Sequence, residues 1–205
     1  MEYNKLSTEE VTKKTIEALA AKNVEAFVVQ SGAEALTKIK ELIPKGASVM
    51  NGASVTLEQI GLVDYLKAGE HGWNNLHAAI VAEKDGAKQA ELRKQALLSE
   101  YYLGSVHGLA ETGEFIIASN TGSQLPHIVF SSQNLIFVVS TKKITPSLPD
   151  AYNRLMEHVI PLEEVHMQQL YGVGTFPSKI VTFNRESEFT GRKVRMILVN
   201  EDLGF

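Results

Sequence analysis

The chain has 205 residues, of which 44% are hydrophobic and 21% charged, and its 20 basic and 24 acidic side chains give a net charge of -4. This composition is typical of a folded globular protein, and the length fits a single domain over residues 1–205. The cations are scattered along the chain, which argues against a nucleic-acid-binding surface. Cysteine is absent, so this chain cannot form disulfides, zinc–thiolate sites or cysteine-ligated iron–sulfur clusters.

Membrane proteins and metalloproteins are two further classes that the sequence does not favour. The start of the chain has no apolar run of the kind found in secretion signals, and no stretch approaches the ~20 apolar residues of a membrane-spanning helix. The six histidines show no recognisable metal-ligand spacing. We therefore expect a cytoplasmic protein with no membrane partner, no bound metal and no cofactor.

The first half of the sequence repeats a strand–turn–helix pattern. Capping-box spacing marks the start of two helices, Ser7 with Glu10 and Ser31 with Glu34. The predicted elements are a helix at 7–22, a strand at 24–30, a helix at 31–43, a strand that ends at the polar turn 51–54, and a helix entered near Thr56.

The second half is richer in apolar, β-branched runs that predict strands. A helix over residues 150–160 is expected to stop at Pro161. The other predicted elements are a helix at 88–100 and strands at 101–106, 114–119, 134–140, 178–184 and 194–200.

Alternation of strands and helices predicts an α/β fold, a three-layer α/β/α sandwich with a largely parallel central sheet. In open sheets of this kind, ligands bind in the crevice beyond the carboxyl ends of the strands. Polar turns that follow predicted strands are therefore the places to look for a site.

The first such turn, "NGAS", contains Asn51, Gly52 and Ser54 and leads into a helix. Its backbone N–H groups and hydroxyls could receive a carboxylate or a phosphate. A capped helix after an Asn-Gly turn explains the same residues without a ligand, and both readings stay open.

The second stretch is "HGLAETGEF", in which Glu111 and Glu114 flank a turn made by Thr112 and Gly113. Two neighbouring carboxylates can perform acid/base chemistry if burial separates their proton affinities, and His107 could carry a proton in the same cleft. Solvated turn glutamates and a structural histidine are the alternatives.

These turns lead to one geometric prediction. We expect Glu111 and Thr112 to share a cleft with the "NGAS" turn, and His107 and Asn120 to lie near its rim. Glycines 113 and 122 would let the backbone approach a ligand closely. The two ends of the strand between them lie ~15–20 Å apart, so both cannot contact one small ligand, and we rank the Glu111 end first and residues 120–123 second.

The segment from Ser105 to Pro161 resembles the LUD-domain family, named for lactate utilisation and also known as DUF162. The resemblance is carried by "AETG" at 110–113, the polar loop around Gly122, the strand 135–139 and Lys143-Ile144. It extends more weakly to "MNGASVTLEQ" and to the end of the chain. Ser119 and Gln124 stand where some relatives have Asp and Arg, and His107 where many have Asn.

The resemblance implies a fold similar to the superfamily of glucosamine-phosphate deaminase, ribose-phosphate isomerase and CoA transferase. It also implies a role in oxidising lactate or a similar small organic acid together with iron–sulfur oxidoreductase subunits. Two alternatives remain: an enzyme that acts on a sugar phosphate or CoA thioester through Glu111, and a regulatory module that binds a small anion. A homo-oligomer is compatible with each of these.

Overall fold

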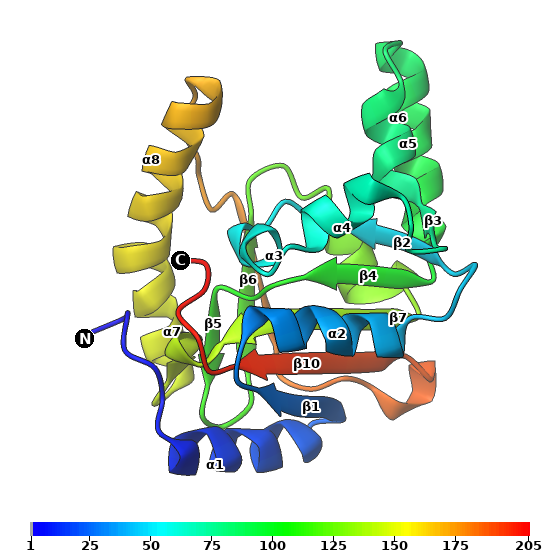
Figure 1. Cartoon of the computed structure of the whole chain (residues 1–205). Coiled ribbons are helices and arrows are strands. Elements are labelled where there is room, and N and C mark those ends of the chain that lie inside the picture. The colour runs from blue at the N-terminus through cyan, green and yellow to red at the C-terminus, as the bar shows by residue number, and fades with distance from the viewer. Residues whose placement is uncertain (1) are drawn as a thin grey trace.

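Figure 1 shows the computed structural model of the protein, which describes residues 2–205. Its centre is a six-stranded sheet in which all pairings are parallel. The largely parallel sheet predicted from the strand–turn–helix repeats is confirmed. Its strands, in spatial order, are β1 (Val24–Val29), β10 (Lys193–Val199), β7 (Asn134–Ser140), β4 (Tyr101–Gly104), β2 (Ser48–Asn51) and β3 (Asn74–Asn75).

Three helices cover one face of this sheet, namely α2 (Gly32–Leu42), α3 (Val55–Gln59) and α4 (Leu62–Ala68). Ile39 and Leu57 project from these helices into a core with Val138 and Ile197 of the sheet. All four side chains are fully buried. The apolar periodicity that predicted these helices therefore reflects a real helix-to-sheet interface.

The opposite face packs against a second sheet with the order β8-β5-β6-β9. Phe115 of this sheet stacks on Phe183 at a centroid separation of 4.7 Å and lies 5.6 Å from Phe137 of the central sheet. The sequence predicted two of these strands but not that they leave the central sheet. The bounds are Gly108–Ala110 for β5, Phe115–Ser119 for β6, Ile144–Thr145 for β8 and Lys179–Phe183 for β9.

Helices complete the layer on this side. Leu19 of α1 (Glu9–Ala20) enters the core between the two sheets. The outer face of β6 packs on α7 (Leu148–Arg154) through Ala151. The molecule is thus a three-layer sandwich in which one outer layer combines helices with a small sheet (Figure 1).

The helix caps differ from the sequence prediction at the first helix. Thr8, not Ser7, is the N-cap of α1, and its side chain accepts a hydrogen bond from the backbone N–H of Val11. Ser7 instead donates its hydroxyl proton to the carbonyl of Thr141. Ser31 caps α2 through the expected side-chain hydrogen bond. The helix expected to start near Thr56 begins at Val55, and Ser54 is its N-cap.

The helix predicted to stop at Pro161 continues through it. A π-helical turn, Leu155–Val159, joins α7 to α8 (Ile160–Tyr171). Pro161 follows directly on the π-helical turn, whose last hydrogen bond runs from the N–H of Ile160 to the carbonyl of Leu155. The helix has therefore already left the i→i−4 pattern that a proline interrupts. The predicted end at Pro161 was wrong because the wider π-helical turn before it relieves the clash between the proline ring and the preceding turn of the helix.

The remaining helices form a hairpin, α5 (Leu76–Ala82) and α6 (Gly86–Gln95), that projects beside β3 (Figure 1). Helix α6 begins two residues before the predicted helix at 88–100 and ends in a short 3-10 turn, Ala96–Leu98. Among residues 2–205, none of the helices combines the length and apolar character needed to cross a bilayer.

Candidate functional site

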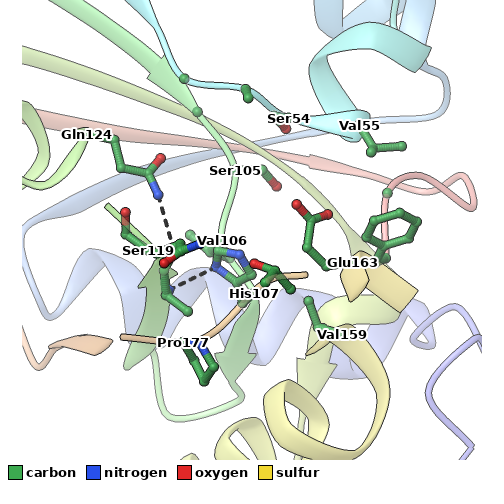
Figure 2. Close-up of a pocket in the computed structure, with 18 of the residues that line it drawn as sticks. Ser54, Val55, Ser105, Val106, His107, Ser119, Gln124, Val159, Glu163 and Pro177 are labelled. Atoms are coloured by element: carbon green, nitrogen blue, oxygen red, sulfur yellow. Dashed lines mark hydrogen bonds between the residues drawn. The ribbon is translucent and has the colours of Figure 1, made fainter. Parts of the chain in front are cut away.

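A cavity of about 340 Å³ opens beyond the carboxyl ends of the central strands (Figure 2). It is lined by residues from the segments that follow β2, β4, β7 and β10, at the edge where ligands bind in open parallel sheets. The far end of β6, the start of α8 and the segment before β9 close the other sides. The residues used below are Gly52, Ser54, Thr56, Ser105, His107, Ser119, Asn120, Gln124, Lys143 and Glu163.

The structure brings together only part of the predicted site. Gly52, Ser54, His107 and Asn120 all line the cavity. Asn51 is buried and lines a smaller neighbouring cavity instead. Whether the lining residues bind or transform a ligand stays a prediction.

The remaining predicted residues lie outside the cavity. Glu111 pairs with Lys14 of α1 at 3.0 Å, and Thr112 hydrogen-bonds Glu114. A Cβ on Gly113 would lie 3.0 Å from the backbone of Ala18, also in α1.

The expectation that Glu111, Thr112 and Gly113 share a cleft with the "NGAS" turn was wrong. β5 and β6 form an antiparallel hairpin, so the 111–114 turn and Ser119 lie at opposite ends of β6. Five residues of strand separate them by roughly 17 Å. The end of β6 that lines the cavity is the Ser119 end, the reverse of the predicted preference. Gly122 does not line the cavity either, because the Lys179 side chain packs against it.

His107 is held in one tautomer at the cavity wall. Its Nδ1 accepts a hydrogen bond from the backbone N–H of Ala118 at 3.1 Å (Figure 2). Burial lowers the pKa of His107 to about 3, and the nearby cations Lys143 and Arg154 add to the effect. The ring is therefore neutral near pH 7 and carries its proton on Nε2, which makes it a hydrogen-bond donor.

Lys143 is a nearly buried lysine, 4% exposed, at the same cavity. Its Nζ donates to the hydroxyls of Thr56 and Ser105, both at 3.1 Å, and to the carbonyl of Val106 at 3.3 Å. None of the carboxylates in residues 2–205 pairs with it. Burial, reinforced by Arg154 and Lys142, lowers the pKa of Lys143 well below its ordinary value.

Arg154 lies behind His107 and is fully buried. One guanidinium nitrogen donates to the backbone carbonyl of His107 at 2.6 Å. Its Nε and its other terminal nitrogen have no partner among the described residues. Burial lowers the pKa of Arg154 to about 10, so the guanidinium still carries its charge near pH 7.

Glu163 is the acidic side chain that lines the cavity. Burial raises its pKa, with a further contribution from Glu58. Figure 2 shows its carboxylate pointing toward Ser105, which accepts the hydrogen bond from Lys143. The cavity therefore combines a neutral imidazole donor, a lysine without a carboxylate partner, and one carboxyl group with an enhanced tendency to hold its proton.

Sequence reasoning missed Lys143 and Glu163 as site residues. Two signals pointed to Lys143: it belongs to the Lys143-Ile144 pair that carries the family resemblance, and it lies four residues after the apolar run 135–139, near the carboxyl end of a parallel strand. Glu163 had no usable signal, because its position depends on the helix that continues through Pro161. The π-helical turn before α8 redirects that helix, so that Val159 and Glu163 both reach the cavity.

Gln124 forms a partition between this cavity and the smaller one, of about 190 Å³. Its amide N–H donates to the carbonyl of Ala118 (Figure 2), and its oxygen accepts from the hydroxyl of Tyr102. A Cβ on Gly52 would lie 2.3 Å from that hydroxyl. Only glycine fits at position 52 unless the partition moves.

Comparison with known proteins gives one family and one fold. A family model described as "LUD domain" matches residues 12–199. No curated protein matches the chain. The structure is similar to the crystal structure of a DUF162 family protein from Deinococcus radiodurans, with a TM-score of 0.60 and 13% identity over 96% of this chain and 100% of that one. At this identity the likeness concerns the fold.

Proposed function

The chain belongs to the LUD domain family, and on that premise we propose that it serves in the use of lactate or a similar small organic acid. The acid binds in the cavity around His107 and Lys143. The observation that carries the proposal is Lys143, a buried hydrogen-bond donor that lines the cavity and has no carboxylate partner among the described residues. A ligand carboxylate can accept a hydrogen bond from Lys143, and its negative charge would offset the charge of the Arg154 guanidinium, which is buried behind His107.

The other polar groups of the cavity suit a small acid with a second oxygen. His107 offers a neutral N–H donor, while Ser54, Ser105 and Ser119 offer hydroxyls. Hydroxyls both donate and accept, so they can serve either a 2-hydroxy or a 2-oxo group. The cavity volume of about 340 Å³ lies at the small end of the range typical of ligand sites.

Oxidation of a hydroxy acid needs an electron acceptor. Since the chain contains no cysteine, we propose that an iron–sulfur oxidoreductase subunit supplies it and that the two proteins work together in the cytoplasm. In the alternative function, Glu111 acts on a sugar phosphate or a CoA thioester. The geometry does not support this alternative, because Glu111 pairs with Lys14 outside the cavity.

Titration calorimetry with L-lactate and with pyruvate tests the binding site. Lys143→Gln should weaken binding by roughly 10-fold or more, since a hydrogen bond to a charged group contributes ~1.5–3 kcal/mol. The matched control is Lys142→Gln. Lys142 is also buried, but it pairs with Asp202 and does not line the cavity. Equal affinities of the wild type and Lys143→Gln, or no binding of either acid to the wild type, would refute the proposal.

A further inference from the structure

We propose that Lys143 is a nucleophile that forms an imine with the ketone carbon of a 2-oxo acid held in the cavity. The inference rests on the proposed function and deepens it, because pyruvate is the 2-oxo counterpart of lactate. A 2-oxo acid would bind through a covalent C=N bond to Lys143, which a 2-hydroxy acid cannot form because it has no ketone carbon. The cavity would thereby distinguish the oxidised acid from the reduced one.

The first argument is the position of Lys143. It ends a 3-10 turn, Thr141–Lys143, that directly follows β7, and its side chain runs to the cavity. Its three hydrogen-bond partners are two hydroxyls and one carbonyl. No carboxylate in the described part of the chain holds it as an ammonium ion.

Lys142 provides a contrast within the same turn. It is buried to a similar degree, but its ammonium group pairs with Asp202 and donates to the carbonyl of Gly204 at 2.7 Å. An ion pair of this kind favours the charged form and so disables the amine as a nucleophile. Of two adjacent lysines, the one without a carboxylate is the one that lines the cavity.

The surroundings of Lys143 favour the neutral amine that imine formation needs. Burial and the cations Arg154 and Lys142 lower its pKa, and His107 nearby is neutral. Desolvation and a neighbouring cation are the two environments that activate lysine for attack on carbonyl carbon. The carboxyl group on this side of the cavity, Glu163, points toward Ser105 rather than pairing with Nζ (Figure 2).

The reaction balances with the groups present. The amine lone pair of Lys143 attacks the ketone carbon, the C–N bond forms, and the carbonyl π bond becomes a hydroxyl after a proton moves from nitrogen to oxygen. A second proton, from Glu163, lets that hydroxyl leave as water while the C=N bond forms. The nitrogen keeps its remaining proton, so the product is a protonated imine and Glu163 is left as a carboxylate. The amine, the ketone and the Glu163 proton thus become a protonated imine and water, with no oxidant or reductant.

The product also fits the electrostatics of the site. A protonated imine carries one positive charge where the ammonium would have been, next to the ligand carboxylate. His107, a neutral donor, and the charged Arg154 behind it lie on the same side. The carboxylate that neutralises the site is therefore retained in the covalent form.

Reductive trapping on the intact protein tests the imine. The protein is incubated with pyruvate and sodium cyanoborohydride and then digested for peptide mass spectrometry. We expect a reduced pyruvate adduct on Lys143 that is absent with L-lactate and absent in Lys143→Gln. The control Lys142→Gln should keep the adduct on Lys143.

Glu163→Gln separates its proton transfer from a structural role. It should slow trapping by roughly 100-fold, within the usual range for general acid catalysis, and remove the basic limb of the pH–rate profile, which reports loss of the Glu163 proton as the pH rises. Two outcomes would overturn the imine while leaving the proposed function standing. One is calorimetric binding of pyruvate without an adduct on Lys143, and the other is an adduct spread equally over surface lysines. Failure of both acids to bind would overturn the proposed function as well.

Discussion

Low pH should lower the free energy of unfolding of this protein, because some histidines are buried as uncharged imidazoles in the folded state. His127 is the clearest case. It is 2% exposed, its Nδ1 lies 3.2 Å from the hydroxyls of both Ser99 and Ser132, and its ring stacks on Tyr102. Burial lowers the pKa of His127 to about 4. The variant that tests the effect is His127→Gln, which keeps a polar group but cannot titrate.

The sign follows from proton binding. An unfolded histidine has a pKa of ~6.5, so between that pH and about 4 the unfolded chain holds one more proton than the folded one at this residue. The free energy of unfolding therefore falls as the pH falls through this window, and it is independent of His127 above it. Lowering the pH from about 7 to about 5 should cost the wild type roughly 2 kcal/mol through His127 alone. His107 adds to the loss in the same direction.

Urea unfolding monitored by fluorescence of Trp73, the single tryptophan and a buried one, measures the effect at both pH values. His127→Gln should be less stable near pH 7, because it loses the serine contacts. It should nevertheless lose roughly 2 kcal/mol less than the wild type on acidification. If both proteins lose the same free energy between the two pH values, His127 does not fold in the neutral state and the reasoning is refuted.

Three further substitutions probe separate parts of the account. Arg192→Met should lower the free energy of unfolding by about 3–5 kcal/mol in urea titrations, because it leaves the buried Glu186 carboxylate without its ion-pair partner and removes the donor to four backbone carbonyls of residues 127–132; a loss below about 1 kcal/mol would contradict this. Gly108→Ala should cost about 1–3 kcal/mol, since its Cβ would meet Ala151 at 2.9 Å, whereas the control Gly86→Ala has open space; equal midpoints for the two would refute the steric argument. Glu111→Gln should leave the calorimetric affinity for L-lactate unchanged, because Glu111 does not line the cavity; a large loss would restore Glu111 to the site.

Much of the fold could be predicted because it depends on local patterns. The apolar runs of β7 and β10 and the cap Ser31 are set by residues close together in the sequence. The second sheet depends on more than local pattern. The strand Phe115–Ser119 has the same kind of apolar sequence as the strands of the central sheet. The short turn between Ala110 and Phe115 is what pairs it with β5 as an antiparallel hairpin, away from the central sheet.

The candidate site was harder to predict because its parts come together through tertiary structure. Ser54 and His107 follow strands that lie side by side, so the carboxyl ends of a parallel sheet bring them together as expected. Glu111 is a carboxylate in a polar turn, as many catalytic residues are. The direction of the β5–β6 hairpin, however, places it beside Lys14 of α1. Glu163 reaches the cavity from a helix that continues through a π-helical turn, and the residues of that turn carry no local pattern that predicts it.

The central claim is that a small organic acid binds between His107 and Lys143. A crystal structure of the protein soaked with L-lactate tests it most directly. The account predicts a lactate carboxylate within hydrogen-bond distance of Nζ of Lys143 and of Nε2 of His107. Lactate bound elsewhere, with solvent alone in this cavity at a saturating concentration, would contradict it.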